Sequence, residues 1–310
     1  MSLKTTTAAL LALAVSAAPA LAGPAHNQTT YNTVDVDDVS IFYREAGPKD
    51  APTILLLHGF PTSSHMFRDL IPELAEKYHV VAPDYPGFGQ SSAPSADEYD
   101  YDFATLSKTM NHFVEALDLD EYTLFMQDFG GPVGLRMLDA HPERVEGVII
   151  QNATFHVEGW NPDIVKQFAP FWGDRNSETE APLRQFLAPQ TTEWQYRQGS
   201  TLAERLSPDA WTHAQAGLDR PGNTEVQLEY LWNYQDNVAN YDAWHAKLAK
   251  LQPETLVVWG QNDPFFTLTG VEAIQKLLPE AETHFYDAGH FALETHAQEI
   301  AGEILEFMAH

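Results

Sequence analysis

The segment FMQDFGGPVG, residues 125–134, contains the residues that decide the fold. An apolar run ends here on Asp128, and Gly130 and Gly131 follow at the start of a helical pattern. This arrangement is typical of a nucleophile elbow, in which the reactive side chain lies at the apex of a strained turn between a strand and a helix. The helix N-terminus beside Asp128 favours negative charge. The alternative interpretation makes Asp128 the N-cap of that helix.

Buried strands alternate with helices on both sides of this segment. Apolar spacing predicts helices over 64–78, 102–118 and 291–308. Apolar runs predict strands in a hairpin over 33–46 and in the stretches 53–59, 79–84, 121–127, 145–153, 254–260 and 281–287. Alternation with short connections predicts an α/β fold with a mostly parallel sheet covered by helices.

The alternation stops between residues 154 and 251. This region is dense in Trp, Tyr, Phe, Gln, Asn and Pro, and its regular apolar spacing is helical. It predicts a mainly helical cap, residues 154–251, inserted after the sixth strand. The core domain would then comprise residues 23–153 and 252–310.

Composition restricts the partners and the compartment. The net charge of −27 over 310 residues disfavours nucleic acid and anionic membrane surfaces as partners. Residues 1–22 have a Lys4 n-region, an apolar stretch and an A-x-A end, which predicts a cleaved signal peptide and an exported protein, periplasmic or extracellular. An uncleaved anchor is the alternative. The chain has no cysteine, so thiol chemistry and disulfides are excluded.

Three polar residues fall at or just after the carboxyl ends of predicted strands, where parallel sheets place their sites. They are Asp128, Asp263 in WGQNDPFF, and His290 in DAGHFALE. The order nucleophile, acid, histidine is that of the α/β-hydrolases. Taken singly, Asp263 is also explained as a turn residue and His290 as a structural loop histidine. The backbone N–H groups of Phe60, in HGF, and Phe129 are candidates for an oxyanion hole.

These motifs together resemble the α/β-hydrolase superfamily. The resemblance covers about residues 33–153 and 252–308 and rests on HGFPTSSHMFRDLIP, DYPGFGQSS, MQDFGG, WGQNDPF and GHFALE. More narrowly, the chain looks like the branch with an aspartate nucleophile, which contains epoxide hydrolases, haloalkane dehalogenases and fluoroacetate dehalogenases. Met126, two residues before Asp128, departs from the small residue often found there.

An aspartate nucleophile implies displacement at sp3 carbon, which gives an alkyl-enzyme ester. His290, held by Asp263, would then activate the water that hydrolyses the ester. Asn152, at the end of the next strand, holds a position where some dehalogenases keep their acid, but an amide cannot fill that role. A carboxylesterase would require a different nucleophile, and a non-catalytic ligand-binding protein of the same fold is a further alternative.

The leaving group separates an epoxide hydrolase from a dehalogenase. WNYQDN, residues 232–237, resembles the segment that carries the ring-opening tyrosine of epoxide hydrolases, which points to Tyr234. Tyr234 is also explained as a packed cap aromatic, and Tyr196 and Tyr230 are the other tyrosines considered. Trp172 is the candidate for a halide-binding indole. Haloalkane dehalogenases usually place Trp after the nucleophile, where this chain has Phe129, and no Arg follows to hold a haloacid carboxylate.

The predicted substrate is apolar, because phenylalanines flank the candidate catalytic residues. Phe265, Phe266 and Phe291 are expected to bind it, with ordinary core packing as the alternative. The sequence therefore predicts an exported hydrolase acting on a small apolar epoxide with water, with haloalkane dehalogenase as the alternative. It indicates no metal and no cofactor, and it does not give the oligomeric state.

Overall fold

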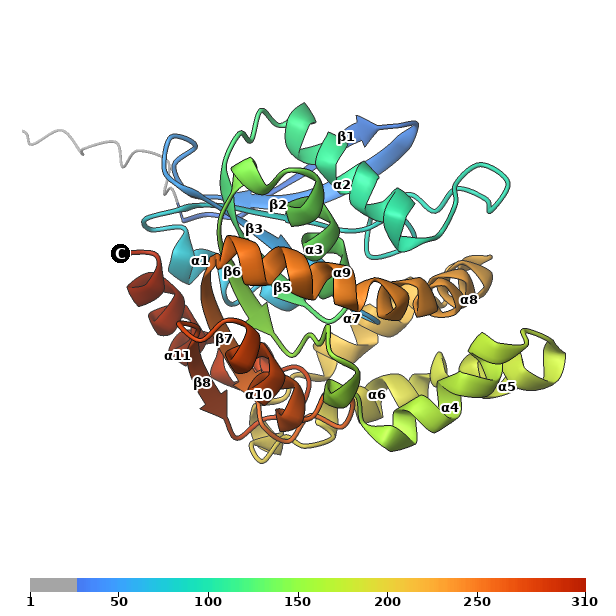
Figure 1. Cartoon of the computed structure of the whole chain (residues 1–310). Helices are drawn as coiled ribbons and strands as arrows, with labels where there is room; N and C mark the ends of the chain where they lie inside the picture. Colours follow the sequence, from blue (N-terminus) through green and yellow to red (C-terminus); the bar gives the residue numbers. More distant parts are fainter. Residues whose placement is uncertain (1–26) are drawn as a thin grey trace, which may run out of the picture.

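The computed structural model describes residues 27–310, so the expected signal peptide, residues 1–22, lies outside the described part. An eight-stranded sheet in the order β1-β2-β4-β3-β5-β6-β7-β8 forms its centre (Figure 1). The strands are β1 (Thr30–Val36), β2 (Val39–Ala46), β3 (Thr53–Leu57), β4 (His79–Pro83), β5 (Tyr122–Gln127), β6 (Val145–Gln151), β7 (Glu254–Gly260) and β8 (Glu282–Tyr286).

The sheet is mostly parallel, as predicted. Only β2 pairs antiparallel, with β1 and with β4, and all other neighbouring strands run parallel. The β1–β2 hairpin turns at Asp37 and Asp38, which both have positive φ angles, of 48° and 65°. Two left-handed residues in a two-residue loop match the twist of the flanking strands.

Helices cover both faces of the sheet. Side chains alternate along β3, so that Leu55 and Leu57 join one hydrophobic cluster and Ile54 and Leu56 the other. Residues of α2 (Phe103–Ala116), α3 (Gly130–Ala140) and α10 (Leu268–Leu277) belong to the first cluster, and residues of α1 (Ile71–Leu74) and α11 (Leu293–Phe307) to the second. The α/β fold class is confirmed.

The single helix expected over 64–78 is wrong in detail. The chain forms a 3-10 helix, η1 (Ser64–Phe67), and then the short α1. Pro72 lies in the first turn of α1, where its missing N–H group costs nothing because that group has no intrahelical partner anyway. A helix that begins at Ile71 therefore suits this sequence better than one continuing through Pro72.

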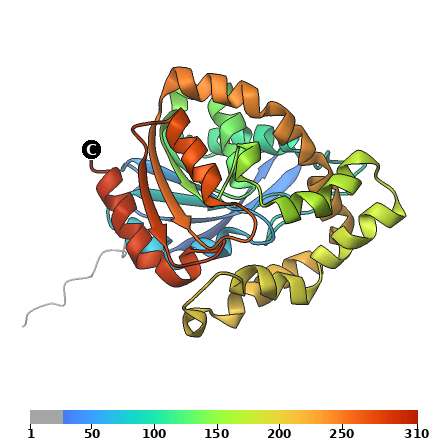
Figure 2. The same ribbon diagram turned by 60° about the horizontal axis from the view of Figure 1, so that its bottom comes forward.

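The chain between β6 and β7 is helical, as the prediction of a cap requires. Figure 2 shows α4 to α8 as a lobe beside the sheet. The helices are α4 (Pro162–Gly173), α5 (Ser177–Phe186), α6 (Pro189–Arg197), α7 (Pro208–Leu218), α8 (Asn223–Asn233) and α9 (Gln235–Leu251). Two 3-10 turns, η3 (Val157–Gly159) and η4 (Ala203–Arg205), lie in the same region, and a third, η2 (Pro142–Arg144), precedes β6.

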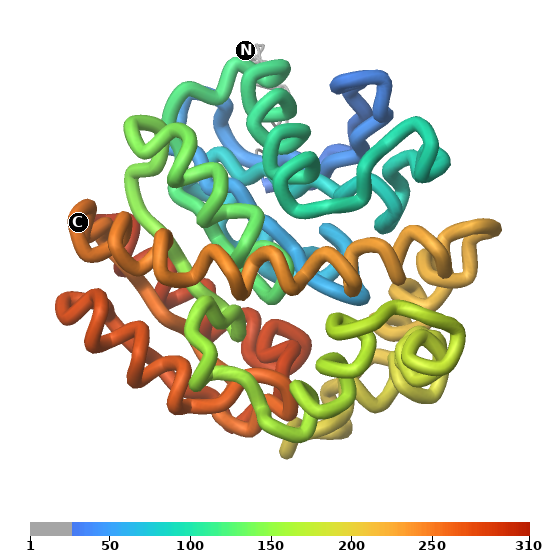
Figure 3. Tube along the Cα trace, turned by 45° about the vertical axis from the view of Figure 1, so that its right-hand side comes forward, coloured from blue at the N-terminus to red at the C-terminus, as the bar shows by residue number. Residues whose placement is uncertain are grey.

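Helix α9 connects this lobe to the core. It runs back across the molecule from the end of α8 toward the sheet (Figure 3). The Arg136 guanidinium of α3 lies 5.1 Å from the ring centroid of Trp244 on α9, so the second half of α9 packs on a core helix. No helix within residues 27–310 combines the length and apolarity needed to cross a membrane.

Candidate active site

The elbow after β5 holds Asp128 in a strained conformation. Its φ angle is +48°, in the left-handed region that non-glycine residues rarely adopt. A Cβ atom at Gly130 would collide with the carbonyl oxygen of Leu57, so the glycine lets α3 start directly against β3. A Cβ atom at Gly134 would collide with the sulfur of Met126. Gly134 therefore provides the room that the unusually large Met126 needs.

The carboxylate of Asp128 lies against the expected oxyanion-hole donors. Its Oδ1 accepts a hydrogen bond from the backbone N–H of Phe60 at 2.6 Å. Burial raises the pKa of Asp128 to about 6, although His290 and the N–H groups of Phe60 and Phe129 act in the opposite direction. The second oxygen, Oδ2, lies on the side of His290. Asp128 is therefore a buried carboxylate that is ionised at neutral pH, with one oxygen held by backbone.

His290 connects Asp128 to Asp263. Its Nδ1 lies 2.8 Å from Asp263 Oδ2, and its Nε2 lies 3.8 Å from Asp128 Oδ2. Burial by itself lowers the pKa of His290, but Asp263 and then Asp128 raise it above the ordinary value of 6.5. The other oxygen of Asp263 accepts from the N–H groups of Phe265 and Phe266 at 2.7 and 3.2 Å. The structure thus brings the three predicted residues into one chain of contacts.

Asn152 completes the surroundings of Asp263. Its Nδ2 donates to Asp263 Oδ2 at 2.8 Å, and its Oδ1 accepts from the N–H of Gly260 at 2.9 Å. The side chain is fully buried. Asn152 thus fixes the carboxylate that faces His290.

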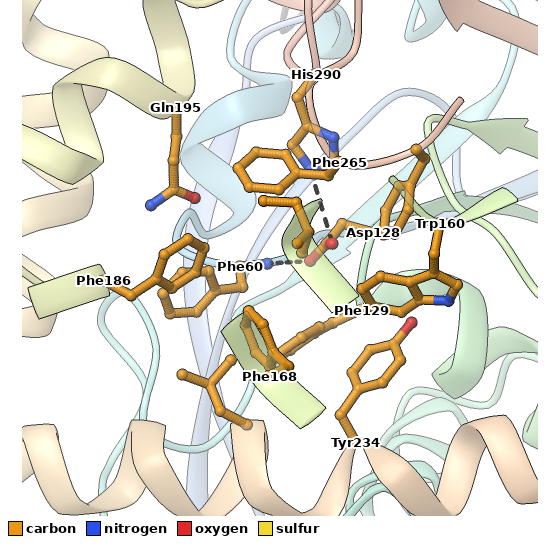
Figure 4. Close-up of a pocket in the computed structure, with 13 residues that line it drawn as sticks. Phe60, Asp128, Phe129, Trp160, Phe168, Phe186, Gln195, Tyr234, Phe265 and His290 are labelled. Carbon is orange, nitrogen blue, oxygen red and sulfur yellow. Dashed lines mark hydrogen bonds and ion pairs between the residues drawn. The ribbon is translucent and has the colours of Figure 1, made fainter. Parts of the chain in front are cut away.

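A cavity of about 40 Å³ separates Asp128 from the cap helices (Figure 4). The core contributes Phe60, Phe129, Phe265, Phe266 and His290 to its wall, beside Asp128. This space holds only a few water molecules, so a substrate of ordinary size enters only if the cap helices move. The cap side contributes Tyr234, which the sequence singled out. It also contributes six residues that the sequence did not single out: Trp160, Ile164, Phe168, Phe186, Gln195 and Leu231.

Tyr234, the candidate ring-opening acid, lies in the wall of this cavity. It joins α8 to α9, lines the cavity and is 3% exposed. Its hydroxyl makes no hydrogen bond of good distance and angle within residues 27–310, although it lies near enough to the Tyr241 hydroxyl for the two to interact. Burial raises the pKa of Tyr234 well above 10, and the nearby Tyr241 and Asp128 raise it further. A buried polar group left unpaired costs about 1–3 kcal/mol, so Tyr234 retains an unpaired donor at a site where a substrate can use it.

Trp172 is not placed as expected. Its indole N–H donates to the carbonyl oxygen of Leu231 at 2.8 Å, and its side chain is not part of the cavity wall. The prediction that Trp172 offers a halide-binding N–H is therefore wrong in this geometry, because the backbone already uses that donor.

Three further aromatic residues considered from the sequence also lie outside the cavity wall. Phe291 stacks on Tyr196 with ring centroids 4.1 Å apart and does not line the cavity, where the prediction of a substrate contact would place it. The hydroxyl of Tyr230 donates to the carbonyl of Pro86 at 3.1 Å. Neither Tyr196 nor Tyr230 therefore supplies a second hydroxyl to the cavity.

Trp160 is the largest cavity residue that sequence reasoning missed. Its Nε1 donates to the Tyr241 hydroxyl at 3.1 Å, and its ring packs edge-on against Tyr234 and Phe266. The sequence feature that could have pointed to Trp160 is its position directly before Asn161, the N-cap of the first cap helix.

Residues 27–310 contain no group of three His, Cys, Asp or Glu side chains that could hold a metal ion.

Comparison with known proteins defines the class. The model of the alpha/beta hydrolase fold family matches residues 52–297, so the chain belongs to this family. It is 37% identical over 276 residues to an uncharacterized hydrolase of Saccharomyces cerevisiae. This alignment covers 88% of this chain and 94% of that protein. It is 29% identical over 291 residues to a haloalkane dehalogenase of Psychrobacter cryohalolentis, covering 87% of this chain and 88% of the relative.

Solved structures agree with this assignment of the fold. The haloalkane dehalogenase DbeA of Bradyrhizobium elkani superposes with a TM-score of 0.74 at 22% identity, covering 91% of this chain and 99% of that one. The epoxide hydrolase CorEH superposes with a TM-score of 0.72 at 21% identity, with the same coverage of 91% and 99%. The resemblance to α/β-hydrolases with dehalogenase and epoxide hydrolase relatives is confirmed.

Proposed function

We propose that this hydrolase opens an apolar epoxide and releases a diol through a covalent ester at Asp128. The observation that carries the proposal is the Tyr234 hydroxyl, which is buried, unpaired and directed into the cavity that also contains Asp128. An epoxide oxygen stays attached to the substrate and needs a proton as the ring opens. Tyr234 can donate that proton, since its raised pKa keeps it protonated at neutral pH.

In the first step, Asp128 Oδ2 attacks an epoxide carbon and the bond from that carbon to the ring oxygen breaks. The ring oxygen takes the proton of Tyr234 and becomes a hydroxyl group. Asp128 Oδ1 keeps its hydrogen bond from the Phe60 N–H throughout. The product of this step is an ester between Asp128 and the substrate.

In the second step, His290 Nε2 takes a proton from water, and the resulting hydroxide attacks Cγ of Asp128. Negative charge develops on Oδ1, where the N–H groups of Phe60 and Phe129 stabilise it. The ester bond then breaks, and the leaving alkoxide takes the proton from His290. The new carboxylic acid of Asp128 returns its proton to the Tyr234 phenolate, which restores the enzyme.

Haloalkane dehalogenase activity is the second candidate, because a relative that is 29% identical carries that name. The indole donors argue against it. Trp172 donates to Leu231, and Trp160 donates to Tyr241, so a halide would have to displace one of these acceptors. The residue after Asp128 is Phe129, which has no side-chain donor.

The test is a comparison of two substrates with the mature chain from residue 23, since we also propose export on the sequence of residues 1–22. Purified protein is incubated separately with styrene oxide and 1-bromobutane, and diol and bromide are measured. The proposal predicts diol formation that is lost in Asp128→Asn, with little bromide release. Bromide release without diol would contradict the proposal and favour the dehalogenase.

A further inference from the structure

Gln195 is a polar residue of the cavity that the proposed reaction does not use. It lies on α6 (Pro189–Arg197), is 1% exposed and lines the cavity, and its Nε2 has no hydrogen-bond partner within the described residues. Figure 4 shows its amide end pointing into the space beside Phe186 and Phe60, away from Tyr234. The cavity therefore has a polar group on each side of Asp128, with aromatic rings between them.

A glutamine on the neighbouring helix shows what a purely structural amide looks like here. Gln215, on α7, accepts from Thr192 Oγ1 at 2.7 Å and donates to Leu187 O at 3.2 Å and to Asp219 Oδ1 at 2.7 Å. Thr192 belongs to α6, so Gln215 fixes the helix that carries Gln195.

The helix that carries Gln195 is thus held in place, while the Nε2 of Gln195 itself remains unpaired. Gln151 is also buried and unpaired, but it does not line the cavity and no substrate can reach it there. A buried polar group without a partner is uncommon in folded proteins and calls for an explanation. At Gln195 the cavity offers one, because a bound molecule can supply the missing hydrogen bond.

We infer that Gln195 is a specificity residue that binds a hydroxyl group of the substrate, at the end of the molecule remote from the epoxide ring. This inference rests on the proposed function. An amide presents a donor and an acceptor, and a hydroxyl group can act as either, so the two pair whichever way the amide lies. The rings of Phe60 and Phe186 stack with their centroids 5.5 Å apart and form an apolar wall beside this amide, against which the body of the substrate would lie. The substrate class is an apolar epoxide with a distal alcohol.

The test uses two epoxides of nearly the same shape, 4-(hydroxymethyl)styrene oxide and 4-ethylstyrene oxide. The wild type should prefer the hydroxymethyl compound in kcat/KM by about 10- to 100-fold, since the ethyl compound leaves one buried amide group without a partner. Gln195→Met, which keeps the side-chain length, should abolish this preference and retain activity on the ethyl compound. The matched control is Ile164→Leu, an apolar change in the same cavity wall, which should affect both epoxides alike.

A binding measurement separates this inference from the reaction assignment. The unreactive pair 4-ethylbenzyl alcohol and 1,4-diethylbenzene is titrated against wild type and Gln195→Met by calorimetry. If neither epoxide is turned over but the wild type prefers the alcohol and Gln195→Met does not, the reaction is misassigned and the role of Gln195 stands. If the wild type prefers neither the hydroxymethyl epoxide nor the alcohol, or if Gln195→Met weakens both members of a pair equally, Gln195 is only structural and the inference is overturned.

Discussion

The two halves of the cavity are built in opposite ways. On the core side, Asp128 and His290 follow the ends of strands. Their polar atoms contact the Phe60 N–H, Asp263 and the side-chain amide of Gln127, whose Nε2 lies 3.0 Å from His290 Nε2. On the cap side, the polar atoms of Tyr234 and Gln195 are buried but unpaired. The core half is therefore largely paired by the protein itself, whereas the cap half has donors left for a molecule in the cavity. This difference suggests that the core performs the chemistry and the cap selects what reacts.

Removing the proposed nucleophile should have the largest effect. Asp128→Asn keeps the shape of the side chain but removes the attacking oxygen anion, so turnover of styrene oxide should fall by about 10⁴-fold or more. The rate is measured by diol formation, with mass spectrometry to verify that Asn has not reverted to Asp. Activity within tenfold of the wild type would mean that the core half does not work through Asp128.

The cap half should contribute less than the core half. Tyr234→Phe removes the unpaired hydroxyl and should lower kcat/KM for styrene oxide by about 10²- to 10³-fold, the range of a general acid. The matched control is Tyr230→Phe, because the Tyr230 hydroxyl is buried but donates to the Pro86 carbonyl outside the cavity wall. Equal losses in the two variants would show that Tyr234 acts only through packing.

The pH dependence of kcat/KM should report the protonation of Asp128 and His290 in the core half. Asp128 must be ionised to attack and has a pKa of about 6, raised by burial. His290 must be neutral to accept a proton, and its pKa lies above 6.5 because Asp263 and Asp128 outweigh its burial. Both groups become active as pH rises, so kcat/KM should fall by about a hundredfold per pH unit well below pH 6, where both are protonated. A rate that is flat between pH 4.5 and 7 would contradict this assignment.

The same burial should make Asp128 costly for stability. Its pKa is higher in the folded protein than the 3.8 of an exposed Asp, so its ionised form destabilises the fold. That penalty is absent below pH 3.8 and complete above about pH 6. Asp128→Asn should therefore raise the free energy of unfolding in urea by about 1–3 kcal/mol at pH 8 and by less at pH 4.5. A variant that is less stable at pH 8 would show that the carboxylate supports the fold.

The smallest effect is expected at Trp172. Trp172→Phe removes one hydrogen bond, to Leu231 O, and should lower the free energy of unfolding by about 1 kcal/mol. Epoxide turnover should stay within a few-fold of the wild type, because Trp172 is not part of the cavity wall. A selective loss of bromide release in this variant would restore Trp172 as a halide ligand.

The core half could be read from the sequence because each of its functional groups belongs to a backbone feature. A strand that ends at Asp128 before Gly130 specifies an elbow, and a parallel sheet brings strand ends to one edge. The local patterns therefore also locate Asp263 and His290.

The cap half could not be read in the same way. Its residues meet through the packing of separate helices, which no short motif encodes, so Trp160 and Gln195 were missed and Trp172 was misplaced. Tyr234 was found only through its resemblance to a family segment. The direction of its hydroxyl depends on how α8 joins α9.

The central claim, a covalent ester at Asp128, is tested most directly by one turnover in ¹⁸O water. Excess enzyme reacts with styrene oxide, and mass spectrometry then examines the diol and the peptide that contains Asp128. We expect ¹⁸O in the Asp128 carboxylate and none in the diol of this first turnover, because water attacks Cγ of the ester. An ¹⁸O-labelled diol with an unlabelled Asp128 would contradict the account, since water would then have opened the epoxide directly.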